Sequence, residues 1–222
     1  MNVRKSLSTF LMMAALVSFA GCSAEAEKAE STDKEKSVDA IVAIAAVGEI
    51  APDFTLTDAT GNKHTLADYK GKYVVLEWTN FGCPFVKKHY NSENMQMLQA
   101  KYTKEDVVWF SICSSAPGKQ GWFEGDDLLA KIKEFNSQAS AYLVDADGKV
   151  ARTYDAKTTP NMYIINPDGK LIYAGAIDDK ASTNVDDIPN SMNYVDAAMI
   201  SAMAGKEIAL NNTVPYGCSI KY

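Results

Sequence analysis

One short stretch of the chain holds the residue best suited to covalent chemistry. Residues 74–90 read VVLEWTNFGCPFVKKHY, and an apolar β-type run changes to a helical pattern at Cys83-Pro84. A cysteine at the start of a helix faces unpaired amide N–H groups and the positive end of the helix dipole, which stabilise its thiolate. The stretch therefore predicts an exposed, nucleophilic thiol at Cys83. A small buried cysteine that only packs is the alternative.

Three charged or titratable residues follow this cysteine on the same expected helix. Lys87 and Lys88 either lie on a solvated face or help to stabilise the thiolate. His89 lies six positions after Cys83, about 240° around the helix, so the two side chains do not share a face. We therefore expect no metal site at this cysteine, and no other cofactor.

The N-terminal 21 residues predict a signal peptide, because basic residues precede an apolar stretch that is too short to span a bilayer. The junction FAGC, which ends at Cys22, resembles a bacterial lipoprotein signal. That resemblance implies cleavage before Cys22 and a lipid on its sulfur, and Ser23 favours the outer membrane. We therefore expect a lipid-anchored protein of the cell envelope that faces the periplasm, where disulfides persist. An ordinary secreted protein is the alternative.

The rest of the chain divides into a tether, one domain and a tail. Residues 22–47 predict a flexible tether, since their first half lacks large apolar side chains. Residues 48–205 suit one domain of ordinary size, and residues 206–222 form a tail that contains Cys218. The net charge of −6 argues against nucleic acid as a partner.

Strand and helix patterns alternate along the domain, which predicts a mostly parallel sheet with antiparallel hairpins. The central strand at 74–78 is apolar nearly throughout, as is typical where both faces of a sheet are covered. The other expected strands are 54–56, 63–66, 107–113, 141–145, 162–166 and 170–174, and the expected helices are 84–102, 128–135, 149–154 and 193–203.

Three motifs in this order resemble one superfamily. They are APDFTLTDATGNKHTLADYKGKYVVLEW, then Cys83-Pro84, then Thr158-Thr159-Pro160 before MYIINPDGKLIYAG. Together they resemble the thioredoxin-like redoxins of AhpC/TSA type, and most closely the peroxiredoxin-like lipoproteins with an NxxCPFVKKHY motif. The resemblance implies an α/β thioredoxin-like fold, in which helices flank a central mixed β-sheet with an N-terminal β-hairpin extension.

The chain departs from the family pattern at three positions. Val86 stands where thioredoxins carry their second cysteine, and Asn80 stands where peroxiredoxins carry a threonine. Pro160 takes the place of the peroxiredoxin arginine and resembles the cis-proline of thioredoxins, whose loop guides the substrate chain beside the cysteine. The resemblance thus implies a cis Thr159-Pro160 bond, a catalytic role for Pro160 and a substrate-binding role for Thr159. A trans proline that opens an edge strand is the alternative, and Asn80 is a candidate to orient a peroxide or to donate to the sulfur.

A disulfide cycle at Cys83 needs a second thiol to resolve the adduct. Cys218 is the first candidate, because a flexible tail can carry its thiol to a distant site at modest entropic cost. Cys113 is the rival candidate, since it ends a strand at the sheet edge that holds the site, although it could equally be inert core. Trp78 and Phe81 either form walls of a substrate site or pack in the core.

These features predict a membrane-tethered thiol-disulfide oxidoreductase that acts through the Cys83 thiolate. Its expected substrates are protein thiols and disulfides, small thiols, or peroxides. One alternative is a peroxiredoxin-like peroxide reductase. Another is a non-catalytic thioredoxin-like module that binds a thiol-bearing or copper-bearing partner.

Overall fold

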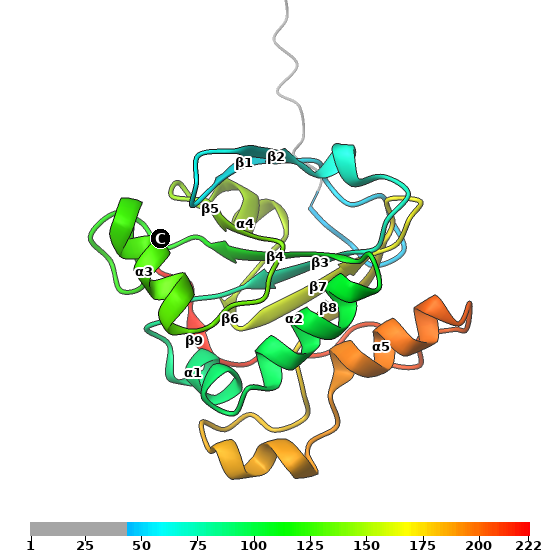
Figure 1. Cartoon of the computed structure of the whole chain (residues 1–222). Helices are drawn as coiled ribbons and strands as arrows, with labels where there is room; N and C mark the ends of the chain where they lie inside the picture. Colours follow the sequence, from blue (N-terminus) through cyan, green and yellow to red (C-terminus); the bar gives the residue numbers. More distant parts are fainter. Residues whose placement is uncertain (1–43) are drawn as a thin grey trace, which may run out of the picture. The chain divides into compact units, whose positions relative to one another are not determined.

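A mixed β-sheet forms the centre of the protein in the computed structural model, which describes residues 44–222. Within this part, seven strands lie in the order β2-β1-β5-β4-β3-β7-β8 (Figure 1). The strands are β1 Thr55–Asp58, β2 Lys63–Thr65, β3 Val74–Trp78, β4 Val108–Cys113, β5 Ala141–Val144, β7 Asn161–Ile165 and β8 Leu171–Gly175. Strands β3, β4 and β5 run parallel, while the hairpins β1-β2 and β7-β8 join their two edges in antiparallel pairing. The expected mixed sheet with an N-terminal hairpin extension is confirmed.

Helices cover both faces of this sheet. The helices are α1 Pro84–Asn91, α2 Asn94–Lys104, α3 Gly125–Glu134, α4 Lys149–Thr153 and α5 Tyr194–Met203. Buried side chains of α1, α2, α3 and α5 share one core cluster, whereas α4 packs into a second cluster on the opposite face. Figure 1 shows α1, α2 and α5 below the sheet and α4 above it.

The apolar residues of strand β3 point to both faces of the sheet. Val75 packs into the first core cluster, and Leu76 and Trp78 pack into the second. All five residues of the strand are buried, as is typical of a strand between two helical layers. The strand therefore ends at a fixed position, directly before the turn that carries Cys83.

Glu77 is the polar exception in this strand. Its fully buried carboxylate accepts four hydrogen bonds of 2.9–3.0 Å, from Tyr90, Gln99, Trp109 and Ser111. Burial raises the pKa of Glu77, against these hydrogen bonds, which favour the ionised form. The cluster fixes α1 and α2 against β3 and β4, and so fixes the helix on which Cys83 depends.

The single helix expected at 84–102 is wrong, because the chain forms two helices there. Helix α1 ends at Asn91, and Glu93 has a left-handed φ of 61° that starts α2 in a new direction. The Ser92 hydroxyl donates to the Lys88 carbonyl oxygen at 2.8 Å, a local bond that competes with helix continuation. The break therefore limits α1 to eight residues.

The C-terminal tail packs on the domain rather than extending from it. Strand β9 (Cys218–Ser219) pairs antiparallel with β6 (Thr158–Thr159) in a separate two-stranded sheet. Figure 1 shows this red segment beside β6 and the start of α1. At the other end of the described chain, Ala45 already donates its amide to Thr153 at 2.9 Å. The expected signal peptide, Cys22 and most of the expected tether lie outside the described residues.

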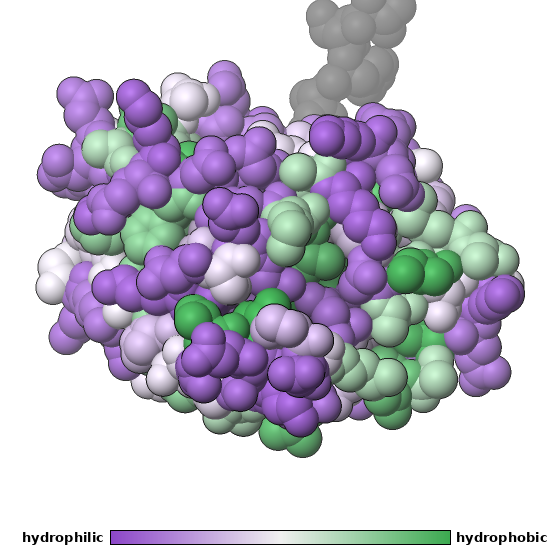
Figure 2. Space-filling model, turned by 60° about the horizontal axis from the view of Figure 1, so that its bottom comes forward, coloured by the Kyte–Doolittle hydropathy of each residue, from purple (hydrophilic) through white to green (hydrophobic). Residues whose placement is uncertain are grey.

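The surface of the described part is polar over most of its area. Figure 2 shows a mainly hydrophilic face with separate small hydrophobic patches. Among residues 44–222, no helix has the length and apolar character needed to cross a bilayer.

Candidate thiol site at the start of helix α1

Cys83 is the residue directly before the first turn of α1. Its backbone is extended, with φ −78° and ψ 127°, and Pro84 occupies the first helical position as expected. Its amide donates to the Asn80 carbonyl oxygen at 2.8 Å, which closes the turn between β3 and the helix. This geometry brings the sulfur to the unpaired amides at the positive end of α1.

The loop before β7 lies against this sulfur. The Thr159-Pro160 peptide bond is cis, which confirms the expectation from the sequence. Cys83 Sγ lies 3.1 Å from the Thr159 carbonyl oxygen, although the two residues are 76 positions apart. The predicted cysteine and the predicted proline loop therefore meet at one place.

The second cysteine at this place is Cys218. Its Sγ lies 2.8 Å from Cys83 Sγ, and its backbone pairs with Thr159 in the β6-β9 ladder. Both thiols are free, and a disulfide bond needs an S–S distance of about 2.05 Å. The two sulfurs are thus in direct contact without a covalent bond.

The expectation of an exposed thiol at Cys83 is wrong, since this residue has no accessible surface. The physical reason is the C-terminal segment 216–222, here called the strap, which lies across the start of α1. Cys218 in the strap is partly exposed. Access to Cys83 therefore requires movement of the strap.

Main-chain hydrogen bonds and a cation–π contact with Arg152 hold the end of the strap. The Ala116 amide donates to the Lys221 carbonyl oxygen at 2.8 Å. The Arg152 guanidinium lies 4.1 Å from the centre of the Tyr222 ring, in a cation–π contact. Gly217 has φ +137°, and an added Cβ would meet the Thr159 carbonyl oxygen at 2.1 Å, so only glycine permits this close approach.

The two sulfurs differ in acidity. Burial acts to raise the pKa of Cys83, but hydrogen bonds from Cys218, Thr159 and the Val86 amide outweigh it and lower the pKa below the ordinary 9.0. Burial, the hydrogen bond to Cys83 and the charge of its thiolate raise the pKa of Cys218 to about 11. Cys83 is therefore the more acidic thiol of the pair.

The Thr159 hydroxyl is a further polar group at the sulfur. The residue is buried, and its Oγ1 forms no hydrogen bond to a nitrogen or oxygen atom of the described residues. A buried hydroxyl without such a partner is costly, and this one acts instead on the Cys83 sulfur, whose pKa it lowers. Thr159 was expected at a substrate site, and the structure brings it to Cys83.

Asn80 shapes the turn and has no hydrogen bond to the sulfur. Its side-chain oxygen accepts from the Gly82 amide at 2.7 Å, and its amide nitrogen donates to Gln120 and Ser115 at 2.9 and 3.3 Å. These contacts occupy both amide hydrogens. They connect the cysteine turn to the loop after β4.

Trp78 and Phe81 pack in the core. Of the two alternatives from the sequence, walls of a substrate site or core packing, the structure therefore supports core packing. Trp78 packs against Tyr154 and Tyr163 on the far face of the sheet, and its ring nitrogen donates to Ser114 at 3.0 Å. Phe81 stacks on Phe135, with ring centres 4.3 Å apart. Neither side chain presents a surface to a substrate in this closed form.

Cys113 lies at the end of β4, buried in the core cluster that also holds Cys83. Its thiol contacts the Gly121 carbonyl oxygen at 3.5 Å. Within residues 44–222, the structure records no hydrogen bond between Cys113 and either Cys83 or Cys218. This geometry favours Cys218 over Cys113 as the resolving thiol.

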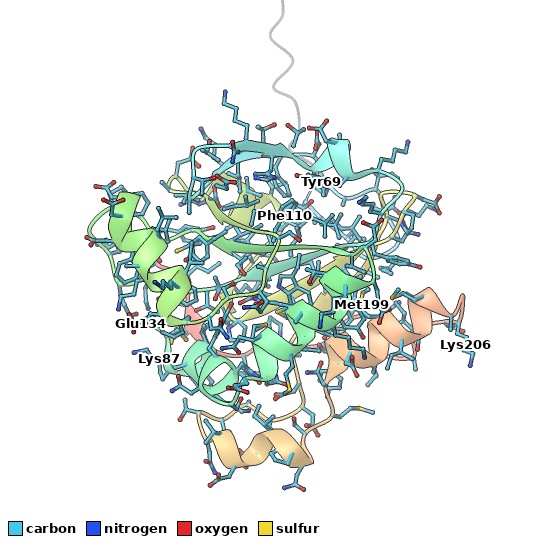
Figure 3. All side chains as sticks on the ribbon, viewed as in Figure 1. Tyr69, Lys87, Phe110, Glu134, Met199 and Lys206 are labelled. Carbon is cyan, nitrogen blue, oxygen red and sulfur yellow. The ribbon has the colours of Figure 1, made fainter. Side chains whose placement is uncertain are left out.

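The two lysines of α1 take different positions. Lys87 is exposed on the outer side of the helix (Figure 3). Lys88, expected on a solvated face or beside the thiolate, is instead 1% exposed and lies close to Asp178, with 3.4 Å between Nζ and Oδ2. No residue near Lys88 in the chain indicates this burial, because Asp178 is 90 positions away.

A thioredoxin-like arrangement emerges from these parts: a central strand, a cysteine at the following helix start, and a cis-proline loop opposite. Two solved structures are similar to this chain in overall fold. A hypothetical protein from Sinorhizobium meliloti 1021 has 25% sequence identity and a TM-score of 0.64, and the match covers 80% of this chain and 94% of that protein's chain. An uncharacterized conserved protein from Geobacillus kaustophilus has 27% sequence identity and a TM-score of 0.67, and the match covers 81% of this chain and 93% of that protein's chain.

Residues 47–174 match the family model for the AhpC/TSA family. The thiol-disulfide oxidoreductase ResA of Bacillus thuringiensis subsp. konkukian is 28% identical over 129 residues, which are 57% of this chain and 67% of that protein. ResA of Geobacillus kaustophilus is 27% identical over 126 residues, with the same coverage. The chain therefore belongs to the AhpC/TSA family, among the thioredoxin-like oxidoreductases.

Proposed function

We propose that the protein is a thiol-disulfide oxidoreductase whose redox pair is Cys83 and Cys218. The observation that carries this proposal is the 2.8 Å contact between the two sulfurs at the positive end of α1. The AhpC/TSA family membership and the similarity to proteins named thiol-disulfide oxidoreductases support it.

The reaction follows from the difference in acidity between the two sulfurs. The Cys83 thiolate attacks one sulfur of a substrate disulfide, forms a mixed disulfide, and releases the other substrate sulfur as a thiolate. The Cys218 thiol then loses its proton and attacks Cys83 Sγ, which releases the second substrate thiolate. Two electrons pass from the cysteine pair to the substrate, and the protein is left with a Cys83–Cys218 disulfide.

Entry of the substrate requires the strap to leave Cys83, because this sulfur is fully covered. The strand pairing between the strap and the domain is only two residues long, at Thr158 and Thr159, and the other contacts of the strap are separate hydrogen bonds and ring contacts. Short pairing of this kind opens locally at modest cost. In the open form, the Thr159-Pro160 loop lies beside the Cys83 sulfur and is available to the substrate.

Peroxide reduction is the second candidate, favoured by the enclosed position of Cys83, which a small oxidant reaches more easily than a protein does. The Cys83 thiolate would attack one peroxide oxygen, break the O–O bond and release hydroxide, which leaves a sulfenic acid on Cys83. The Cys218 thiol would then attack the Cys83 sulfur, form the disulfide and release water. Asn80 counts against this candidate, since both of its amide hydrogens bond elsewhere.

The location that we propose is the periplasmic face of the outer membrane, with a lipid on Cys22 as the anchor. The support comes from the FAGC sequence that ends at Cys22 and from Ser23 after it. In that compartment a cysteine pair can cycle with protein thiols and disulfides as partners.

The experiment is a single turnover of the reduced protein with oxidised glutathione, and in a second arm with hydrogen peroxide. Cys83→Ser abolishes thiol release, Cys218→Ser accumulates a mixed disulfide with glutathione on Cys83, and Cys113→Ser behaves as the wild type. A wild-type protein that reacts with neither oxidant faster than free cysteine would favour the non-catalytic binding module. Reaction with peroxide alone would favour the second candidate.

A further inference from the structure

A buried polar cluster connects the strap to the helix that starts at Cys83. Lys88 and His89 come from α1, Asp178 follows β8, and Tyr216 is the first residue of the strap. The side chains of Lys88 and His89 are completely buried, and that of Asp178 is 1% exposed. Charged groups are rarely buried unless they are paired, so this cluster has a specific structural task.

The hydrogen bonds of the cluster form a chain in which each donor points towards Asp178. The Asn94 side-chain amide donates to His89 Nδ1 at 2.9 Å, which assigns the proton of the neutral ring to Nε2. His89 Nε2 then donates to the Tyr216 hydroxyl at 3.2 Å, and this hydroxyl donates to Asp178 Oδ1. Burial and the nearby Lys88 lower the pKa of His89 to about 4, against the opposing charge of Asp178, so the ring stays neutral near pH 7.

Lys88 and Lys180 fix the carboxylate that receives these bonds. Lys88 Nζ lies 3.4 Å from Asp178 Oδ2 and donates to the Lys180 carbonyl oxygen at 2.8 Å. The Lys180 amide donates to Asp178 Oδ1 at 2.9 Å. The carboxylate is therefore held from two sides before Tyr216 binds to it.

Tyr216 stands two residues before Cys218 in the chain. Its ring also packs against Phe85 in the first turn of α1, with ring centres 5.8 Å apart. On the other side of Cys218 in the chain, Ser219 pairs with Thr158, and Ile220 and Lys221 form main-chain hydrogen bonds. Tyr216 is thus a polar side-chain anchor two residues from the resolving thiol, and its hydroxyl is bound to His89 of the helix that starts after Cys83.

We propose that Lys88, His89 and Asp178 act through Tyr216 as a latch that positions Cys218 on Cys83. This inference rests on the proposed function, because it assigns the cluster to the resolving step of that reaction. The latch residues do not touch the reacting sulfurs. They raise the effective concentration of the Cys218 thiol at Cys83 and return the strap to the same place after each opening.

The test compares Tyr216→Phe with a matched variant, Tyr102→Phe. Tyr102 makes the same kind of bond, from its hydroxyl to Asp196 at 2.6 Å, between α2 and α5 and away from the strap. Each reduced protein is equilibrated in glutathione buffers, quenched with an alkylating reagent and weighed, which gives the effective concentration of Cys218 relative to Cys83. We expect at least a tenfold decrease for Tyr216→Phe and a change within twofold for Tyr102→Phe, with similar shifts in thermal unfolding.

A second pair of variants keeps the test informative if Tyr216→Phe folds poorly. His89→Gln keeps an amide that can donate to the Tyr216 hydroxyl, and should stay within threefold of the wild type. His89→Leu lacks that donor and should show a larger decrease. Equal effective concentrations of Cys218 in His89→Gln and His89→Leu would overturn the latch alone. Equal effective concentrations in Tyr216→Phe and Tyr102→Phe would do the same. A wild type that forms no Cys83–Cys218 disulfide in these buffers would instead overturn the proposed function.

Discussion

Substitution of one glycine should separate the strap from the cysteine without touching either sulfur. Gly217 adopts φ +137° directly before Cys218, and its Cα lies against the main chain of Thr159. In Gly217→Ala, the new Cβ would lie 2.1 Å from the Thr159 carbonyl oxygen and 2.8 Å from its carbon, where ordinary contacts begin at 3.4 Å. Because the obstacle is main chain rather than a flexible side chain, β9 must move away from β6 by about 1 Å or more.

Two effects add up in this variant. The left-handed backbone costs an alanine about 1–2 kcal/mol, and the displacement of β9 removes the contact between the two sulfurs. We expect the effective concentration of Cys218 at Cys83 to fall at least tenfold, which corresponds to about 1.4 kcal/mol. We also expect Cys83 to become accessible, with alkylation of its thiol at least ten times faster than in the wild type.

Gly61→Ala is the matched control for backbone strain. Gly61 has φ +91°, and an added Cβ there meets nothing within 4 Å. The assay combines the glutathione equilibrium with the rate of iodoacetamide labelling, read at each cysteine by peptide mass. If Gly217→Ala forms the disulfide as readily as Gly61→Ala and still protects Cys83, the close packing of the strap described above is refuted.

Three further results are expected from the acidity and burial of single groups. Cys218→Ala should raise the pKa of Cys83, because the thiolate loses the hydrogen bond of the Cys218 thiol; an unchanged pH profile of Cys83 alkylation would contradict this. Thr159→Val keeps the side-chain shape but removes the hydroxyl that lowers the pKa of Cys83, so it should raise the same pKa by a smaller amount, measured in the same way. The pKa of His89 is lowered from 6.5 to about 4, so the unfolded chain takes up this proton at a higher pH than the folded protein. Stability present above pH 6.5 should therefore be lost as the pH falls towards 4, by about 3 kcal/mol in urea unfolding, and His89→Gln should show a flatter profile over this window.

The sequence contained enough to predict the sheet and the two sides of the thiol site. Strand β3 and the Cys83-Pro84 helix start follow from local patterns, namely a continuous apolar run and proline at the first helical position. The cis bond at Pro160 followed from the resemblance of the surrounding motif rather than from a local rule.

The remaining features depend on contacts between distant parts of the chain. The break between α1 and α2 occurs at Glu93, where neither glycine nor proline marks a turn. The strap makes a strand of only two residues, which leaves no periodic pattern to recognise. Because that strand covers Cys83, the burial of this thiol could not be predicted from residues near it.

The central claim is that Cys83 and Cys218 form the redox pair, and one measurement tests it most directly. The reduced protein is treated with one equivalent of a disulfide-forming oxidant, its free thiols are blocked, and its proteolytic fragments are weighed without reduction. We predict one crosslinked pair of peptides that joins Cys83 to Cys218, with Cys113 blocked as a free thiol. A crosslink from Cys83 to Cys113, or three blocked free thiols, would contradict the claim.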